Sequence, residues 1–311
     1  MSVDVIIPVY KPDERLLTII NKLVNQSVVP GRICIMNTEE KYWEMFLAGK
    51  NIDTCKIPLN VQHVSAWEFD HGKTRNEGAK GSCADFLLYM TQDAVPFDEH
   101  LIENLLECFK DGEVASAYAR QMCDDKASVS EQFSRLFNYP DEPVVKSAKD
   151  KERLGIKTYF CSNSCAMYRK EVFDKLGGFP VNMIFNEDMV YAHRVIENGY
   201  KIAYCPKAQV IHYHNYTNLQ QFKRNFDLAV SQAMHPEVFE SVSSESEGKK
   251  YALNAFSYFC GRKKPLLIIP FCITCACRLI GFKLGKNYRK LPKSLVQKLS
   301  DSPKFFRKNL N

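Results

Sequence analysis

Residues 84–96, ADFLLYMTQDAVP, contain the pattern that decides the fold. Five apolar residues, Phe86–Met90, are followed at once by the polar residues Thr91, Gln92 and Asp93. A short apolar run of this kind predicts a strand buried on both faces, as in a parallel sheet covered by helices. A carboxylate placed directly after such a strand is costly unless it is solvated, paired or bound to a cation. The run therefore predicts both a sheet and a site at its edge.

Strand-like and helix-like segments alternate on both sides of this run. Further strands are predicted at 3–9, 32–36, 61–64, 114–119, 159–168 and 201–213, and helices at 12–24, 42–47, 72–84, 99–109, 129–137, 170–176 and 186–197. This alternation predicts an α/β fold with a mostly parallel sheet and right-handed crossovers. Because ligands of such sheets bind beyond the carboxyl ends of the strands, chemistry is expected at Pro8–Tyr10, after Met36 and at Asp93.

The remaining segments are of two kinds. Residues 123–153 are polar, and we expect them to form an excursion over the site. Beyond Asn218 the pattern is helical to the end of the chain. A length of 311 residues fits one α/β domain with an appendage better than two equal domains. We therefore predict an α/β domain over 1–217, divided near residue 120, and a helical C-terminal region over 218–311.

Composition is that of an ordinary globular protein, with 45% hydrophobic and 25% charged residues, and excludes disordered and collagen-like classes. The N-terminus MSVDVIIPVY has no basic segment and too short an apolar run for a signal peptide. We therefore expect a cytoplasmic protein whose 12 cysteines are mostly reduced and buried.

Positive charge is concentrated at the C-terminal end. Residues 262–311 contain 13 Lys and Arg but only one acid, Asp301, although the whole chain has a net charge of +6. Such asymmetry indicates an anionic surface or nucleic acid as partner of the basic end. Nucleic acid is the weaker interpretation, because the basic residues flank an apolar segment and the sequence shows no recognised nucleic-acid-binding motif.

That apolar segment is 266–282, which includes Pro270 and Arg278. It is at the lower limit of length for a membrane span. Apolar residues with basic flanks on both sides favour a helix lying in the membrane interface over a core helix with a solvated basic tail. We therefore expect a peripheral protein on the inner face of the cell membrane, and the core helix remains the alternative.

Four groups of residues could carry chemistry. Asp93 could hold Mg²⁺ or Mn²⁺ with a diphosphate, or could cap the following helix. His71-Gly72-Lys73-Thr74-Arg75-Asn76 opens a helix and suits a diphosphate, or forms a solvated basic turn. Glu187 and Asp188 begin another helix, where acids are favoured by the dipole, yet a carboxylate there could also act as a general base. His212 and His214 lie two residues apart on an extended segment and so share a face.

The order of these groups matches a known family. The chain resembles the family-2 glycosyltransferases, and within them the bacterial rhamnosyltransferase-like group that builds O-antigen and wall polysaccharides. The resemblance runs from about Val3 to about Tyr216. It includes VIIPVY, FDHGKTRN, LYMTQDAVP, SNSCAMYRKEVFDKLGGFP, NEDMVYAHRVIENGY and HYH, and the tail segment GFKLGKNYRKLPKSL is also similar.

The resemblance implies a GT-A-type fold, with nucleotide-sugar binding in residues 1–120 and acceptor binding in 121–217. It implies that Pro8 and Tyr10 line the base pocket and that His71, Arg75 and Gln92 also belong to the donor site. It further implies a cation held by Asp93 with His212 or His214, and Asp188 as the base beside Glu187.

Two positions depart from the family pattern. Thr91 replaces the first acid of the usual D-x-D, so that cation binding depends more heavily on Asp93. Asn37-Thr38 stands where an acid usually follows the second strand, and base recognition is therefore left open.

By the same resemblance, the expected activity is inverting, metal-dependent transfer of L-rhamnose from dTDP-L-rhamnose to a glycan or polyprenyl-linked glycan. A UDP-hexose or UDP-N-acetylhexosamine donor is the alternative within this chemistry. A sugar-1-phosphate nucleotidyltransferase is more distant, because a Gly- and Arg-rich loop would be expected after the first strand, where Pro8-Val9-Tyr10 stands. A non-catalytic membrane scaffold would give no reason for so many polar groups at strand and helix ends.

Overall fold

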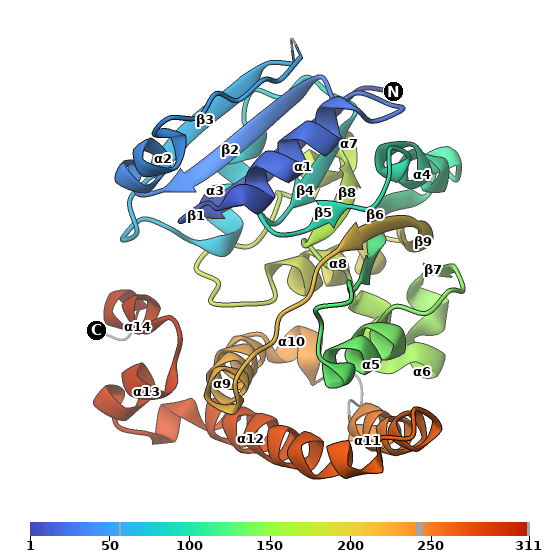
Figure 1. Ribbon diagram of the computed structural model, residues 1–311, viewed down its shortest axis with the longest axis vertical. Coiled ribbons are helices and arrows are strands. Elements are labelled where there is room, and N and C mark those ends of the chain that lie inside the picture. Colours follow the sequence, from blue (N-terminus) through green and yellow to red (C-terminus); the bar gives the residue numbers. More distant parts are fainter. Residues whose placement is uncertain (56, 241–244, 310–311) are drawn as a thin grey trace. The chain divides into compact units, whose positions relative to one another are not determined.

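The computed structural model describes residues 1–55, 57–240 and 245–309 (Figure 1). It divides into two compact units. The first contains 1–124, 139–182 and 187–213, and the second contains 125–138, 183–186 and 214–311. The second unit therefore combines the C-terminal segment with two short earlier segments.

The first unit is built on a nine-stranded sheet with the order β3-β2-β1-β4-β8-β6-β9-β5, and β7 pairs with β9 off this path. The strands are β1 (Val3–Tyr10), β2 (Arg32–Thr38), β3 (Leu59–Val64), β4 (Phe86–Met90), β5 (Val95–Pro96), β6 (Val114–Met122), β7 (Val144–Lys146), β8 (Cys165–Arg169) and β9 (Lys201–Ile211). The strands β3, β2, β1 and β4 are parallel, whereas β8 is antiparallel to both β4 and β6. The α/β prediction is confirmed.

Helices cover both faces of the parallel half of the sheet. The helices of this unit are α1 (Glu14–Val24), α2 (Glu40–Leu47), α3 (His71–Ala79), α4 (Leu101–Glu107), α6 (Lys151–Leu154), α7 (Lys170–Lys175) and α8 (Glu187–Glu197). Alternate β1 residues such as Ile7 share a core with the apolar face of α1. Ile6 points the other way, where α3 lies so close that a Cβ added to Gly78 would be 2.6 Å from its methyl group.

The structure differs from the predicted elements around 139–168. A single strand was expected at 159–168, but 155–159 form a 3-10 helix and β8 begins only at Cys165. The intervening turn carries Asn163, a buried polar residue. Part of the polar excursion also enters the sheet, because Val144–Lys146 pair with β9. Neither feature has a local periodicity that would predict it.

The second unit is helical, as predicted. It contains α5 (Val129–Asn138), α9 (Asn218–Met234), α10 (Pro236–Phe239), α11 (Glu245–Gly261), α12 (Ile268–Lys286), α13 (Lys293–Leu299) and α14 (Pro303–Asn309). The helices α9 and α12 pack side by side (Figure 1). Their backbones are in close contact, because a Cβ added to Gly281 or Gly285 would lie 2.3 Å from a carbonyl oxygen of α9. Only glycine permits this approach.

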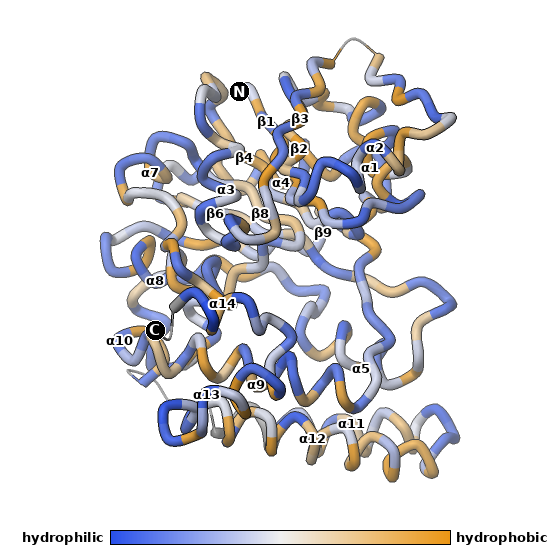
Figure 2. Tube along the Cα trace, turned by 90° about the vertical axis from the view of Figure 1, so that its left-hand side faces the viewer, coloured by the Kyte–Doolittle hydropathy of each residue, from blue (hydrophilic) through white to orange (hydrophobic). Residues whose placement is uncertain are grey.

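Most of the apolar segment at 266–282 is not buried within this unit. The helical stretch Pro265–Lys286 is long and apolar enough to cross a membrane, yet only 11% of its most apolar part is buried. Leu266, Ile269 and Ile273 are more than half exposed, and Figure 2 shows hydrophobic residues along both α11 and α12. Arg278 points inward, where its Nε donates to Gln221 Oε1 at 2.9 Å. The one charge within this apolar segment is therefore satisfied by α9, and the exposed side chains are mainly apolar.

Candidate active site

Asp93 follows β4 in a turn closed by a hydrogen bond from the Ala94 N–H to the Thr91 carbonyl at 3.2 Å. It does not cap the next helix, because α4 begins after His100. Its carboxylate lies 3.4 Å from His212 Nε2 and 4.0 Å from Arg15 Nη1. The capping interpretation of Asp93 is therefore wrong.

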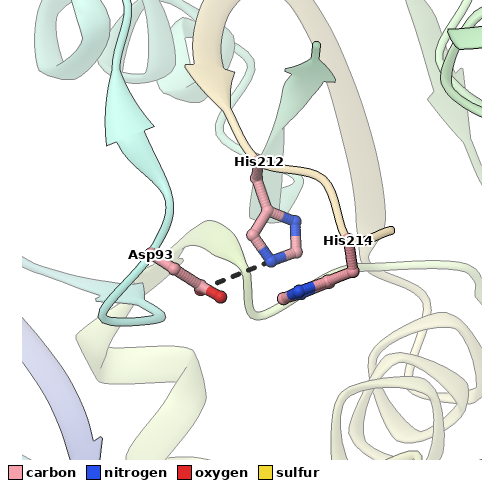
Figure 3. A group of neighbouring side chains, drawn as sticks. All are labelled: Asp93, His212 and His214. Carbon is pink, nitrogen blue, oxygen red and sulfur yellow. Dashed lines mark ion pairs between the residues drawn. The ribbon is translucent and has the colours of Figure 1, made fainter. Parts of the chain in front are cut away.

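His212 follows the last residue of β9, and His214 lies two residues further along the chain. Each offers a ring nitrogen, and these nitrogens and an Asp93 oxygen all lie within 4.8 Å of one another. Figure 3 shows the carboxylate and the two rings converging on the same point. One carboxylate and two imidazoles are a suitable donor set for a divalent transition-metal ion, and imidazole favours Mn²⁺ over Mg²⁺.

Gln92 holds the end of β1 in place. Its Oε1 accepts from the Tyr10 N–H at 2.8 Å, and its Nε2 donates to the Tyr10 carbonyl at 2.9 Å. This pair of bonds continues the contact between β1 and β4 beyond the last ladder pair, Ile6 with Tyr89. Gln92 thus positions the backbone of Tyr10.

Tyr10 is half-exposed at the carboxyl end of β1, where its ring meets the Tyr42 ring edge-on at 5.4 Å between centroids. The Lys11 ammonium lies 5.3 Å from the Tyr10 centroid and 5.2 Å from that of Tyr42. Lys11 has a φ of 51°, a conformation that non-glycine residues seldom adopt outside turns and functional sites. Lys11 and Tyr42 were not predicted from the sequence as site residues. Pro8 lies in β1, two residues before Tyr10, and pairs with Met36 of β2.

Arg75 is directed toward an acid of the site. Asp70 caps α3 by accepting from the Lys73 N–H at 2.7 Å, and one turn later Arg75 is only 5% exposed. Its Nη1 donates to the His71 carbonyl at 2.9 Å and lies 3.3 Å from Glu187 Oε1. The structure thus places Arg75 as the counter-charge of a buried carboxylate.

Contacts of Gly72 and Asn76 bring α3 against Phe179 and Pro180. A Cβ on Gly72 would lie 1.8 Å from the Pro180 carbonyl oxygen, so no other residue fits there. Asn76 accepts from the Phe179 N–H at 3.0 Å and donates to the Phe179 carbonyl at 2.9 Å. The FDHGKTRN and GGFP motifs are therefore two sides of one packed contact.

Glu187 and Asp188 have different environments although they are neighbours. Burial acts to raise the pKa of Glu187, but Arg75, His71 and Asn163 outweigh it, and the pKa is lowered. Burial and the charge of Glu187 raise the pKa of Asp188 to about 7, despite hydrogen bonds from the N–H groups of Asn163 and Met189. The charge of Arg75 acts on the pKa of Asp188 as well, but it is the smallest of the influences there. Glu187 is therefore a fixed anion, and Asp188 can exchange a proton near neutral pH.

Asn163 joins the two acids and was not singled out from the sequence. Its N–H donates to Asp188 Oδ2 at 3.1 Å, and its Nδ2 donates to Glu187 Oε1 at 3.2 Å. Its own Oδ1 accepts from the Tyr168 hydroxyl at 2.7 Å. The SNS motif contained the signal, but only the fold shows what the asparagine contacts.

Acids and imidazoles thus gather at the carboxyl edge of an α/β sheet, where ligands of such folds bind. Residues 4–177, more than half of the chain, match Glycosyl transferase family 2, and the chain belongs to this family. It is a glycosyltransferase with a GT-A fold.

The chain is 34% identical to the O-antigen chain rhamnosyltransferase RfbN of Salmonella typhimurium, over 96% of this chain and 94% of that protein. It is 39% identical to the O-antigen chain rhamnosyltransferase WbaN of Salmonella anatum, over 78% and 77%. Two solved structures share the fold. One is S. aureus TarS (TM-score 0.53, 15% identity, 93% of this chain and 92% of that chain). The other is the mannosyltransferase PcManGT from Pyrobaculum calidifontis in complex with GDP-Man and Mn²⁺ (TM-score 0.54, 12% identity, 98% and 84%).

Proposed function

We propose that this glycosyltransferase moves L-rhamnose from dTDP-L-rhamnose to a growing or lipid-linked O-antigen glycan, with inversion at the anomeric carbon. Two relatives named as O-antigen chain rhamnosyltransferases, at 34% and 39% identity, support the choice of sugar and acceptor class. The observation that carries the mechanism is the contrast between Glu187, paired with Arg75, and Asp188, whose pKa is raised to about 7.

Asp188 is proposed as the general base. Its carboxylate accepts the proton of the acceptor hydroxyl as that oxygen bonds to the anomeric carbon, and the bond from this carbon to the diphosphate breaks. The products are the extended glycan, the nucleoside diphosphate and a protonated Asp188, which then returns its proton to solvent. A base with a pKa near the working pH is the most effective one for this transfer.

Asp93, His212 and His214 are the residues that would hold a divalent cation, and their mixed donors support Mn²⁺ in preference to Mg²⁺. Such a cation neutralises negative charge on a departing diphosphate. The Arg15 guanidinium, 4.0 Å from Asp93 and half-exposed, adds positive charge at the same place.

The nucleotide is proposed to bind over the end of β1. Pro8 and Tyr10 would line the base pocket, with Lys11 and Tyr42 beside them, while Gln92 fixes the Tyr10 backbone. His71 and Arg75 would contribute charge to the diphosphate side, and Arg75 does so while paired with Glu187.

Donor choice gives the direct test of this function. Slow hydrolysis of dTDP-L-rhamnose to dTDP should exceed that of UDP-glucose and UDP-N-acetylglucosamine by at least about tenfold, because a site that binds one sugar through hydrogen bonds rejects analogues that leave its polar groups unpaired. Released nucleotide is measured by ion-exchange chromatography, with the Asp188→Asn protein as the background control. A preference for either UDP-sugar would overturn the rhamnose assignment.

We also propose that the C-terminal region binds the inner face of the cell membrane peripherally. The exposed apolar side chains of α12 would enter the acyl boundary, and exposed Lys263, Lys264, Lys283 and Lys290 would meet anionic headgroups. The inward contact of Arg278 with α9 supports a helix that lies on the membrane with one side packed on protein.

Membrane binding should depend on salt and on these lysines. Replacing the four lysines by Gln should weaken binding to vesicles with anionic lipid by up to about 4 kcal/mol, since each basic residue near the surface contributes about 1 kcal/mol. Vesicle co-sedimentation at low and high salt measures this. Matched replacement of four exposed lysines of the first unit, Lys41, Lys80, Lys110 and Lys149, should leave binding unchanged. Full-length protein that does not sediment with anionic vesicles at low salt would refute the interfacial helix.

A further inference from the structure

Gln121 lies between the cation-binding group and the two acids. It is the penultimate residue of β6 and is 2% exposed. The register between β6 and β9 shifts after Ala119, so that Arg120 pairs with Gln209 and Gln121 with Val210. Such irregularities re-aim side chains, and they are common beside active sites. As a result the Gln121 amide reaches His212, just past the end of β9.

Both ends of the Gln121 amide are engaged. Its Oε1 lies 2.8 Å from His212 Nδ1, and its Nε2 donates to Ser162 Oγ at 2.9 Å. The Ser162 hydroxyl in turn donates to Ser164 Oγ at 3.4 Å. With this orientation the amide oxygen can only accept, so Nδ1 must carry the ring proton. A neutral His212 then has its lone pair on Nε2, the nitrogen that lies 3.4 Å from Asp93 Oδ1.

We propose that Gln121 is a positioning residue for the cation site, acting through His212. By accepting from Nδ1–H it fixes both the orientation of the ring and the tautomer whose Nε2 can bind a cation beside Asp93. A hydrogen-bond acceptor behind a histidine ligand has this function in metal sites generally, and its loss costs about 10–100-fold in metal affinity. The inference rests on the cation site of the proposed function, and it assigns a role to a residue outside that site.

The same amide connects the cation-binding group to the acids. Ser162, which accepts from Gln121, directly precedes Asn163, whose N–H binds Asp188. Gln121 therefore contacts His212 of the cation-binding group and also Ser162, the residue before the one that binds Asp188. The connection to Ser162 can be removed separately from the one to His212, which makes the two contributions distinguishable.

The first test needs no metal, and it uses a variant only to assign the His212 signal. Nitrogen-15 NMR of histidine-labelled, metal-free protein distinguishes the two neutral tautomers, and the His212 signal is identified among the seven histidines by its absence in His212→Ala. The expected result is the Nδ1–H tautomer. The Nε2–H tautomer would mean that Gln121 donates to the ring, and it would overturn the proposal.

The second test measures Mn²⁺ affinity by electron paramagnetic resonance. Gln121→Leu should weaken binding about 10–100-fold. Gln121→Glu keeps an acceptor for Nδ1–H but loses the donor to Ser162, so Mn²⁺ affinity should be restored to within a few-fold of wild type. A general packing defect would not be rescued in this way. Ser162→Ala should leave Mn²⁺ affinity unchanged.

The outcomes separate this inference from the function it rests on. Wild-type protein that binds no Mn²⁺ would refute the cation site and the role of Gln121 with it. Wild-type protein that binds Mn²⁺ while Gln121→Leu binds it equally well would refute only the role of Gln121. Circular dichroism and thermal unfolding establish that each variant is folded before its affinity is interpreted.

Discussion

Replacing Asp188 by Asn should reduce kcat by about a hundredfold or more while leaving dTDP and Mn²⁺ affinity nearly unchanged. General-base assistance is worth about 10² to 10⁴-fold, and the amide keeps the size of the carboxylate but cannot take a proton. Steady-state kinetics measures the loss, and calorimetry with dTDP measures nucleotide binding. The wild-type rate itself should rise with pH through about 7, because burial and Glu187 raise the pKa of Asp188 to that value and only its ionised form can act.

Stability provides the control for this variant. A carboxyl group whose pKa is raised by folding destabilises the protein above its unfolded pKa, because the unfolded chain ionises more readily. The Asn variant should therefore be at least as stable as wild type at pH 8 in thermal unfolding. A large drop in Tm would show that the loss of activity reflects unfolding.

Glu187→Gln is the matched change at the neighbouring acid, and its effects should differ. It leaves the buried Arg75 guanidinium without its carboxylate, which typically costs about 3–5 kcal/mol of stability. It also removes the charge that helps raise the Asp188 pKa, so the pH profile should shift to lower pH. A near-native rate in Asp188→Asn together with an inactive but folded Glu187→Gln would reverse the assigned roles.

Asp93→Ala should abolish detectable transfer and should weaken Mn²⁺ binding by more than about a hundredfold. Losing a residue that only hydrogen-bonds to a metal ligand costs up to about a hundredfold, and losing a ligand itself should cost more. Asp93 is the one carboxylate in the Asp93–His212–His214 group, so its loss removes the negative charge that favours a divalent cation. EDTA should likewise stop wild-type turnover, and added Mn²⁺ should restore it more effectively than Mg²⁺.

Nucleotide binding distinguishes this variant from Asp188→Asn. Calorimetry should show weakened dTDP binding in Asp93→Ala even at high Mn²⁺, whereas Asp188→Asn should bind normally. Asp98→Ala, five residues further along the same segment and outside the group, serves as the control with near-native metal affinity. Full wild-type activity in EDTA would exclude a role for the cation in transfer. The Arg side chains would then be the groups that neutralise the diphosphate.

The sequence alone determined the elements whose signals are local. The apolar run Phe86–Met90 is a buried strand, and Asp93 lies at the site edge. The helices that begin at His71 and Glu187, and the helical region after Asn218, also follow from short-range patterns. These predictions succeeded because apolar periodicity and capping act within a few residues along the chain.

The partners of the polar side chains were decided only by the tertiary structure. Arg75 meets Glu187, Asn163 holds both acids, and Gln121 reaches His212 across 91 positions in the sequence. These contacts depend on strand order, on the shifted register of β6 and β9 and on the close approach at Gly72. The sequence also did not determine how much of α12 is exposed, because that depends on which helices pack against it. Local sequence does not determine which distant side chain a polar residue will contact, because that depends on how the elements pack. The helices and strands of this enzyme could therefore be predicted, whereas the contacts among its site residues could not.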